Sequence, residues 1–354
     1  MSFLKKINYF LAVIPVLLFS LGYVIHLSTS QERASLQLIF FVIAYTAFWV
    51  VSVVDYHLLV ILHKRLYFLI AFLLVLVLVL GKTVLGSVRW LSFGFLNFQP
   101  SEFAKFALVV YIAFYLAAHP RTVKNYKELL RLALPVLGLI LLVILQPDLG
   151  SSIVLFFVFA GMLFVGGLNW LYFFFAICFF GVLSNPIWNL LKDYQKHRIM
   201  VFLNPSLDTL GKGYNVLQSL ISIGSGGFFG KGFGHGSQSH LNFLPIYWTD
   251  FIFAAFAEEW GFIGVFVLLS LFCTLFCSIL YCALKASDRL GALLSFGVLI
   301  VVFSQFVINI GMNMGLLPVT GIPLPLVSYG GTSMLTTALL LGLAHSVWLH
   351  RKHV

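Results

Sequence analysis

The sequence has very little charge. Only 9% of its 354 residues are charged, whereas 61% are hydrophobic. A soluble domain carries about 25% charged residues, and a soluble chain with this composition would expose much of its apolar excess to water. The apolar runs are too long for the strands of a membrane barrel, so the backbone groups in lipid must be paired within helices. The composition therefore excludes a soluble fold and predicts an all-α polytopic integral membrane protein.

Cysteine is also scarce, and patterns for metal binding or disulfides are missing. Two of the four cysteines, Cys273 and Cys277, are four residues apart, but no histidine or carboxylate lies beside them. They are interpreted, with Cys178 and Cys282, as packing residues within apolar runs. No small-residue cleavage site follows the first apolar run, so we expect this run to be retained as a span.

Long apolar runs predict about ten transmembrane helices in one membrane domain that covers residues 1–354. The eighth run is too long for a perpendicular span, so it must tilt or extend beyond the bilayer. The predicted spans cover residues 8–28, 36–54, 66–81, 101–118, 132–146, 149–167, 169–190, 251–282, 291–312 and 330–348.

Lysine and arginine are distributed unevenly among the short loops. Loops and ends on one side of the predicted spans hold most of them, whereas the short loops opposite hold only Arg33, Lys82 and Arg89. The positive-inside rule therefore predicts that both termini are cytoplasmic. It places three connections outside the cytoplasm, namely residues 82–100, a large loop at about 191–250, and 313–329. The net charge of +10 is interpreted as topology and not as nucleic-acid binding.

Polar motifs border the predicted fourth and sixth spans. Glu102 and Lys105 lie three residues apart on one helix face near the membrane boundary, where ionisable groups usually face a protein interior or a watery cavity. A structural ion pair or interfacial anchoring is the alternative. Ser101 is expected to be the N-cap of the fourth span, and Asp148 is a candidate helix cap for the sixth span.

The large loop combines cations with a series of glycines between residues 224 and 236. Glycine permits close backbone approach, and exposed N–H groups suit a phosphate, to which Lys196, Arg198 and Lys231 would add positive charge. A flexible linker has a similar composition. At the end of this loop, Asp250 is bordered by aromatic and apolar residues. A carboxylate in such a setting is a candidate general base, and a helix N-cap is a second, compatible role.

These motifs together resemble the SEDS family (shape, elongation, division and sporulation), and more its rod-shape members than its division members. The motifs are FQPSEFAK at 98–105, QPDLGSS at 146–152, GYNVLQS at 213–219, TDFIFA at 249–254, AEE at 257–259 and GIPLPLVSYGGTS at 321–333. The resemblance implies a peptidoglycan glycosyltransferase of the bacterial cytoplasmic membrane that polymerises lipid II for cell elongation. It also implies a class B penicillin-binding protein and other elongation-complex membrane proteins as partners.

The resemblance further implies roles for particular residues. Asp250 matches the candidate catalytic carboxylate, and Glu102 with Lys105 matches a charged pair that the family requires. The sequence departs from the family pattern LPE-x-His-TD, because Ile246 occupies the glutamate position and Trp248 the histidine position. Stabilisation of the leaving diphosphate needs cations. The candidate substrate-binding residues are Arg89, Glu102, Lys105, Lys196, Arg198, Gln218, Ser219 and Ser328.

Other interpretations stay open at this point. A divalent cation, Mg²⁺ or Mn²⁺, is a second source of positive charge, but the sequence has no Asp-x-Asp motif and names no ligands for it. A lipid II flippase would also explain charged groups near the membrane, although its site should lie near the midplane, often within repeated halves. A noncatalytic scaffold for a transpeptidase is the third alternative.

Overall fold

The computed structural model describes residues 7–84, 87–93, 96–183, 186, 188–189, 193–204, 208 and 211–351. Within these residues, eight helices are long and apolar enough to cross a membrane, so the predicted polytopic helical fold is confirmed. They are α1 (Tyr9–Thr29), α2 (Gln31–Val53), α4 (His63–Leu80), α5 (Pro100–Ala118), α6 (Tyr126–Leu145), α13 (Ile252–Leu284), α14 (Arg289–Asn313) and α15 (Gly331–Leu349).

Two shorter apolar helices, α7 (Leu149–Val165) and α8 (Trp170–Val182), match the predicted sixth and seventh spans. The predicted end of the seventh span lies largely outside the described residues. The remaining short elements are α3 (Tyr56–Ile61), the 3-10 helix η2 (Thr122–Lys124), α10 (Asp193–Leu203), α11 (Lys212–Ser225) and α12 (Ser237–His240).

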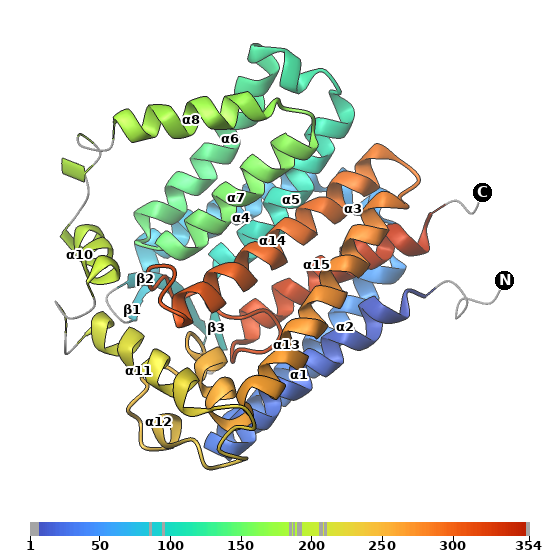
Figure 1. Ribbon diagram of the computed structural model, residues 1–354. Coiled ribbons are helices and arrows are strands. Elements are labelled where there is room, and N and C mark those ends of the chain that lie inside the picture. The colour runs from blue at the N-terminus through green and yellow to red at the C-terminus, as the bar shows by residue number, and fades with distance from the viewer. Residues whose placement is uncertain are drawn as a thin grey trace.

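The bundle has two different ends (Figure 1). One end carries a small β-sheet, the helices α10, α11 and α12, and the segment 313–330, and we call it the sheet end. Both chain termini leave the bundle on the opposite side, which we call the termini end. The three connections that the sequence placed on one side therefore do lie together.

The connection at residues 82–100 contains a small β-sheet, for which the sequence predicted no secondary structure. Strands β1 (Lys82–Val84), β2 (Ser87–Phe93) and β3 (Leu96–Phe98) form an antiparallel meander, with Lys82 opposite Trp90 and Leu91 opposite Phe98. Its sequence is rich in β-branched and aromatic residues, which favour strands. Hydropathy marks spans and not the structure between them, so the sequence did not predict this small sheet within the otherwise helical fold.

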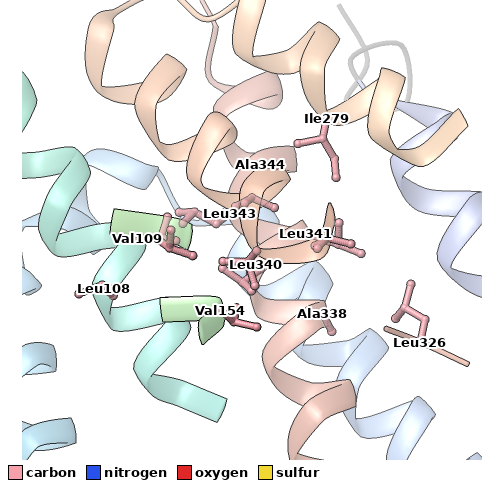
Figure 2. Packing of buried hydrophobic residues seen from close by; sticks show 14 of the residues in the cluster. Leu108, Val109, Val154, Ile279, Leu326, Ala338, Leu340, Leu341, Leu343 and Ala344 are labelled. Carbon is pink, nitrogen blue, oxygen red and sulfur yellow. The ribbon is translucent and has the colours of Figure 1, made fainter. Parts of the chain in front are cut away.

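The core lies around three central helices. About 67% of the spanning window of α5, 61% of α14 and 72% of α15 is buried, against 28% of α2 and 22% of α4. Figure 2 shows apolar side chains of α15, residues 338–344, between α5 and α7 on one side and Leu326 with Ile279 on the other. The outer helices therefore present most of their apolar surface to lipid, while the central helices hold the segments of the sheet end in place.

The long eighth span is broken at Gly261, whose φ of 62° and ψ of −162° are not helical. The break leaves backbone groups of α13 without helical partners, and residues 227–232 pair with them. Lys231 and Gly232 donate their N–H groups to the carbonyls of Glu258 and Glu259, each at 3.0 Å. Lipid would leave such groups unsatisfied, so the break depends on the docked loop.

The glycines of this loop allow the close approach. A Cβ on Gly226 would lie 2.0 Å from the carbonyl oxygen of Ala257, and one on Gly230 would lie 2.1 Å from that of Glu259. Gly230 also has a φ of +80°, which L-residues rarely adopt. In the described structure these glycines serve packing against α13, and the N–H groups of Lys231 and Gly232 are already paired.

Candidate active site

The backbone at Asp250 is fixed by two asparagines from the last turns of α14. The Asp250 carbonyl oxygen accepts hydrogen bonds from Nδ2 of Asn309 at 3.0 Å and Nδ2 of Asn313 at 2.9 Å. The Oδ1 atom of Asn313 accepts a bond from the N–H of Ala254 in the first turn of α13. Both asparagines are fully buried. Asp250 is therefore held at the junction of α13 and α14.

The side chain of Asp250 lies against a glycine. The N-cap position of α13 is occupied by Phe251, so the N-cap position predicted as an alternative for Asp250 was wrong. A Cβ on Gly321 would lie 3.4 Å from Oδ2 of Asp250. Gly321 also has a φ of +76°. The half-buried carboxylate thus reaches the proline- and glycine-rich segment that the sequence singled out.

Ser328 connects this segment to the residues before Asp250. Its hydroxyl donates to the carbonyl of Thr249 at 2.7 Å and accepts a bond from the N–H of Leu324 at 2.8 Å. The N–H of Tyr329 donates to the carbonyl of Trp248 at 2.9 Å. The described contacts of Ser328 therefore order the backbone around Asp250.

Gln37 is a site residue that our sequence interpretation missed. Its Nε2 donates to the carbonyl of Ser328 at 3.0 Å, and its Oε1 accepts from the N–H of Gly330 at 3.2 Å. Gln37 is fully buried on α2. A glutamine in an apolar run is rare enough in a membrane helix to signal such a role.

A second cluster surrounds Asp148. Its Oδ1 caps α7 by accepting from the N–H of Ser151 at 3.1 Å, which confirms the predicted cap. The same atom lies 3.5 Å from Nη1 of Arg89 on β2. The hydroxyl of Ser101 donates to Oδ2 at 3.0 Å, while the N-cap of α5 is Gln99, so the predicted N-cap role of Ser101 was wrong. Asp148 thus neutralises Arg89 and joins α5 to α7.

Glu102 and Lys105 form a buried ion pair on α5. The Lys105 Nζ lies 2.5 Å from Oε1 of Glu102, and their side chains are 1% and 4% exposed. No further hydrogen bond or ion pair of these two charged groups occurs among the described residues. A buried pair with few additional partners stabilises a fold poorly. The pairing was predicted, and its role in the cavity stays a prediction.

The large loop places its candidate residues unevenly. Ser219 on α11 is fully buried and donates its hydroxyl to the carbonyl of Asn313 at 2.8 Å, so it fixes α11 beside the asparagine that holds Asp250. Gln218 precedes it and is half-buried, as is Lys196 on α10. The backbone of Arg198 also belongs to α10, but its side chain lies outside the described part of the structure.

The two positions that depart from the SEDS pattern have unusual surroundings. Ile246 has a φ of +52°, an unfavourable conformation for a β-branched residue. The indole of Trp248 lies beneath the guanidinium of Arg33, with Cζ 3.9 Å from the ring centroid. Neither residue places a carboxylate or an imidazole near Asp250.

The described residues contain no group of three or more His, Cys, Asp or Glu side chains arranged to hold a metal ion. The divalent cation considered from the sequence therefore stays an untested alternative. Any ion at this site would rely on Asp250 together with oxygen atoms of a substrate, the usual arrangement for Mg²⁺.

Comparison with known proteins gives consistent matches over almost the whole chain. The FtsW/RodA/SpoVE family model, described as a cell cycle protein, matches residues 3–353. The peptidoglycan glycosyltransferase MrdB of Escherichia coli K12 is 41% identical over 291 residues, which are 81% of this chain and 78% of MrdB. A probable peptidoglycan glycosyltransferase FtsW of Hydrogenovibrio crunogenus is 40% identical over 284 residues, 77% of this chain and 71% of that protein.

Solved structures match the fold as well. A chain from a structure on the coordination of polymerization and crosslinking by a peptidoglycan synthase complex is 31% identical, with a TM-score of 0.85 and 97% of each chain covered. The rod shape determining protein RodA of Thermus thermophilus is 28% identical, with a TM-score of 0.73 and 98% of each chain covered.

Proposed function

The chain belongs to the FtsW/RodA/SpoVE family, the SEDS family that its motifs resembled, and from this membership we infer that it is a peptidoglycan glycosyltransferase with its reaction centre at Asp250. The enzyme class follows from relatives that carry this name at about 40% identity. The similarity to RodA and MrdB supports a role in cell elongation. The observation that supports this site is the pair of hydrogen bonds that the side chains of Asn309 and Asn313 donate to the Asp250 carbonyl oxygen.

We propose lipid II as both donor and acceptor. Asp250 takes the proton of the acceptor 4-hydroxyl as that oxygen attacks the anomeric carbon of the donor. A new glycosidic bond forms, the bond from that carbon to the phosphate oxygen breaks, and polyprenyl diphosphate leaves with the electron pair. One base is enough for such an inversion, and no covalent enzyme intermediate is needed. Glu258 and Glu259 are buried against the docked loop, which supports assigning the base to Asp250.

The leaving diphosphate needs positive charge. Lys105 is 1% exposed and bound to Glu102, so it can contact the diphosphate only if this pair opens. Arg89 is 17% exposed and shares its charge with Asp148, and its Nε atom has no partner among the described residues. Lys196 is half-buried on α10. We propose Arg89 and Lys196, with Arg198, as the cations that face the diphosphate.

We also propose a location and partners. The sheet end faces outward from the bacterial cytoplasmic membrane, and both termini face the cytoplasm, which the lysine and arginine asymmetry supports. A class B penicillin-binding protein is the proposed partner, because a similar chain occurs in a peptidoglycan synthase complex. Other membrane proteins of the elongation machinery would join it.

A flippase for the same lipid is the rival function. Arg89 lies on β2, Lys105 lies near the start of α5, and Asp250 lies just before α13, so all three belong to segments at or beside the sheet end. A transporter site is expected near the midplane, so this clustering at one end supports polymerisation. A noncatalytic scaffold for the transpeptidase is the third alternative, and it predicts no glycan synthesis with or without the partner.

The test is the Asp250→Asn variant, assayed for glycan strands made from labelled lipid II with and without the partner transpeptidase. A lost general base should lower the rate by at least about 10²-fold, while binding of lipid II changes little. Asp55→Asn at the termini end is the matched control, since asparagine caps α3 about as well. Near wild-type synthesis by Asp250→Asn would exclude this base, and retained flipping without synthesis would reveal two activities.

A further inference from the structure

Arg33, in the first turns of α2, lies on the aromatic residues that precede Asp250. Its Cζ atom is 3.9 Å from the ring centroid of Trp248 and 5.7 Å from that of Tyr247. Its Nη1 donates to the hydroxyl of Tyr247 at 3.1 Å. A guanidinium over an indole is attracted by the ring, by about 0.5–1 kcal/mol at exposed sites and more when desolvated. The pair fixes the orientation of the guanidinium plane.

The surrounding hydrogen bonds fix its position as well. Ser30 caps α2 by accepting from the N–H of Arg33. One turn later, Gln37 binds both Ser328 and Gly330. Since Trp248 accepts from the N–H of Tyr329, the start of α2 and the segments 247–250 and 328–330 form one unit. Arg33 therefore has a set position relative to Asp250.

Among the described residues, the charge of Arg33 has no carboxylate partner, unlike the charges of three other cations. At the sheet end, Arg89, Lys105 and Lys231 each lie within 4 Å of a carboxylate. Arg33 forms no such ion pair among the described residues, and one bond from Nη1 uses only one of its five donors. Stacking occupies the face of the guanidinium and leaves its N–H edge for an oxyanion, either a carboxylate or a phosphate.

We propose that Arg33, presented by the Trp248 ring, is a substrate-binding residue that holds an oxyanion of the lipid-linked substrate beside Asp250. The proposal rests on the proposed function, which places the reaction at Asp250. The shared chemistry is a phosphate oxygen of the diphosphate or a carboxylate of the peptide. It also gives Trp248 a purpose at the position where the family usually has histidine, since indole is the best cation–π platform.

The kinetic test uses Arg33→Lys, which keeps the positive charge but loses the paired N–H donors and the flat stacking surface of the guanidinium. We expect the KM for labelled lipid II to rise about tenfold, with kcat within about twofold, as for lost ground-state binding. Arg351→Lys is the matched control, because Arg351 lies over Trp348 in the same way at the termini end, with Cζ 3.1 Å from the ring. That variant should keep the wild-type KM.

A binding test identifies the anion and separates this proposal from the assignment of Asp250. The assay measures binding only, so it can be carried out in an Asp250→Asn background without turnover. Bound labelled lipid II is displaced with undecaprenyl diphosphate or with the soluble stem pentapeptide. Weaker displacement by undecaprenyl diphosphate after Arg33→Lys assigns the phosphate, and weaker displacement by the peptide assigns the carboxylate. Unchanged displacement by both probes overturns the proposal. In the kinetic test, a variant with a lower thermal midpoint and a lower kcat but an unchanged KM also overturns it, because Arg33 would then only stabilise the fold.

Discussion

The Lys105–Glu102 and Lys231–Glu258 pairs have nearly the same geometry and very different surroundings. Their N–O distances are 2.5 Å and 2.6 Å. Glu258 also accepts bonds from the hydroxyl of Ser237 and the N–H of Gln238, whereas the described bonds of the pair on α5 are confined to the pair itself. A carboxylate with several donors can stabilise a fold, while an isolated buried pair mostly does not. The second pair therefore fits the attachment of the loop to α13, while a role in substrate binding stays the prediction for the first pair.

The largest loss of stability should come from disrupting the attachment of the glycine loop to α13. In Gly230→Ala, the new Cβ would meet the Glu259 carbonyl at 2.1 Å, and the residue would keep a φ near +80°. We expect a destabilisation of at least about 3 kcal/mol, seen as loss of monodisperse protein in size-exclusion chromatography after mild heating. Gly224→Ala is the control, since nothing lies within 4 Å of its Cβ and a helix interior prefers alanine by about 0.5–1 kcal/mol. Equal behaviour of both variants would contradict the role given to the loop.

The next prediction compares the loss of stability on removing Lys105 with the loss on removing Lys231. Lys105→Ala should cost about 3–5 kcal/mol, because it strands a buried carboxylate. Lys231→Ala should cost less, about 1.5–3 kcal/mol, because Glu258 keeps its other donors. The double variant Glu102→Gln with Lys105→Met should recover stability but not glycan synthesis. Thermal midpoints of the purified variants measure the first two effects. A stable, fully active double variant would reduce the pair on α5 to an anchor.

The smallest effect on stability is expected at the termini end, where the charged groups around His57 are exposed to solvent. His57 lies 2.8 Å from Asp55 and 3.0 Å from Asp288, and it is half exposed. Although partial burial opposes the charged ring, its bonds to Asp55 and Asp288 raise the pKa of His57 above its ordinary value of 6.5. The stabilisation is thus complete below pH 6.5 and is lost as pH rises through the higher folded-state pKa.

His57→Gln should therefore lower the thermal midpoint slightly at pH 6 and less at pH 9, since solvent screens such exposed groups. Melting curves of wild type and variant over this range measure the difference. A difference that grows with pH would refute the sign. A difference as large as that of Lys105→Ala would remove the contrast between buried and exposed pairs.

Span boundaries illustrate how far hydropathy reaches. The predicted starts at residues 36 and 132 are later than the observed starts at Gln31 and Tyr126. Both helices continue into polar sequence and begin at a capping residue, Ser30 or Asn125, whose side chain accepts a backbone N–H. Apolar runs report the part of a helix that lies in hydrocarbon, while caps set where it begins.

The sequence identified most residues of the candidate site, but it did not reveal which of them contact one another. The motifs picked out Asp250, Ser328 and Ser219, but they did not reveal that Ser328 and Ser219 make buried bonds to backbone carbonyls. Arg33 was noted only as a loop charge, although it lies over Trp248. These contacts join residues that are far apart in the chain, so no local pattern reports them.

The sequence by itself determined that the chain is a helical membrane protein, roughly which residues its spans cover, and that its unusual polar segments share one side. These properties depend on solvent transfer, which acts residue by residue and is therefore written in composition. Only the tertiary structure decided that α13 breaks at Gly261, that a glycine loop satisfies the break, and that α14 holds Asp250. These features depend on which distant backbone groups meet, because unpaired polar groups in a bilayer must find partners elsewhere in the fold.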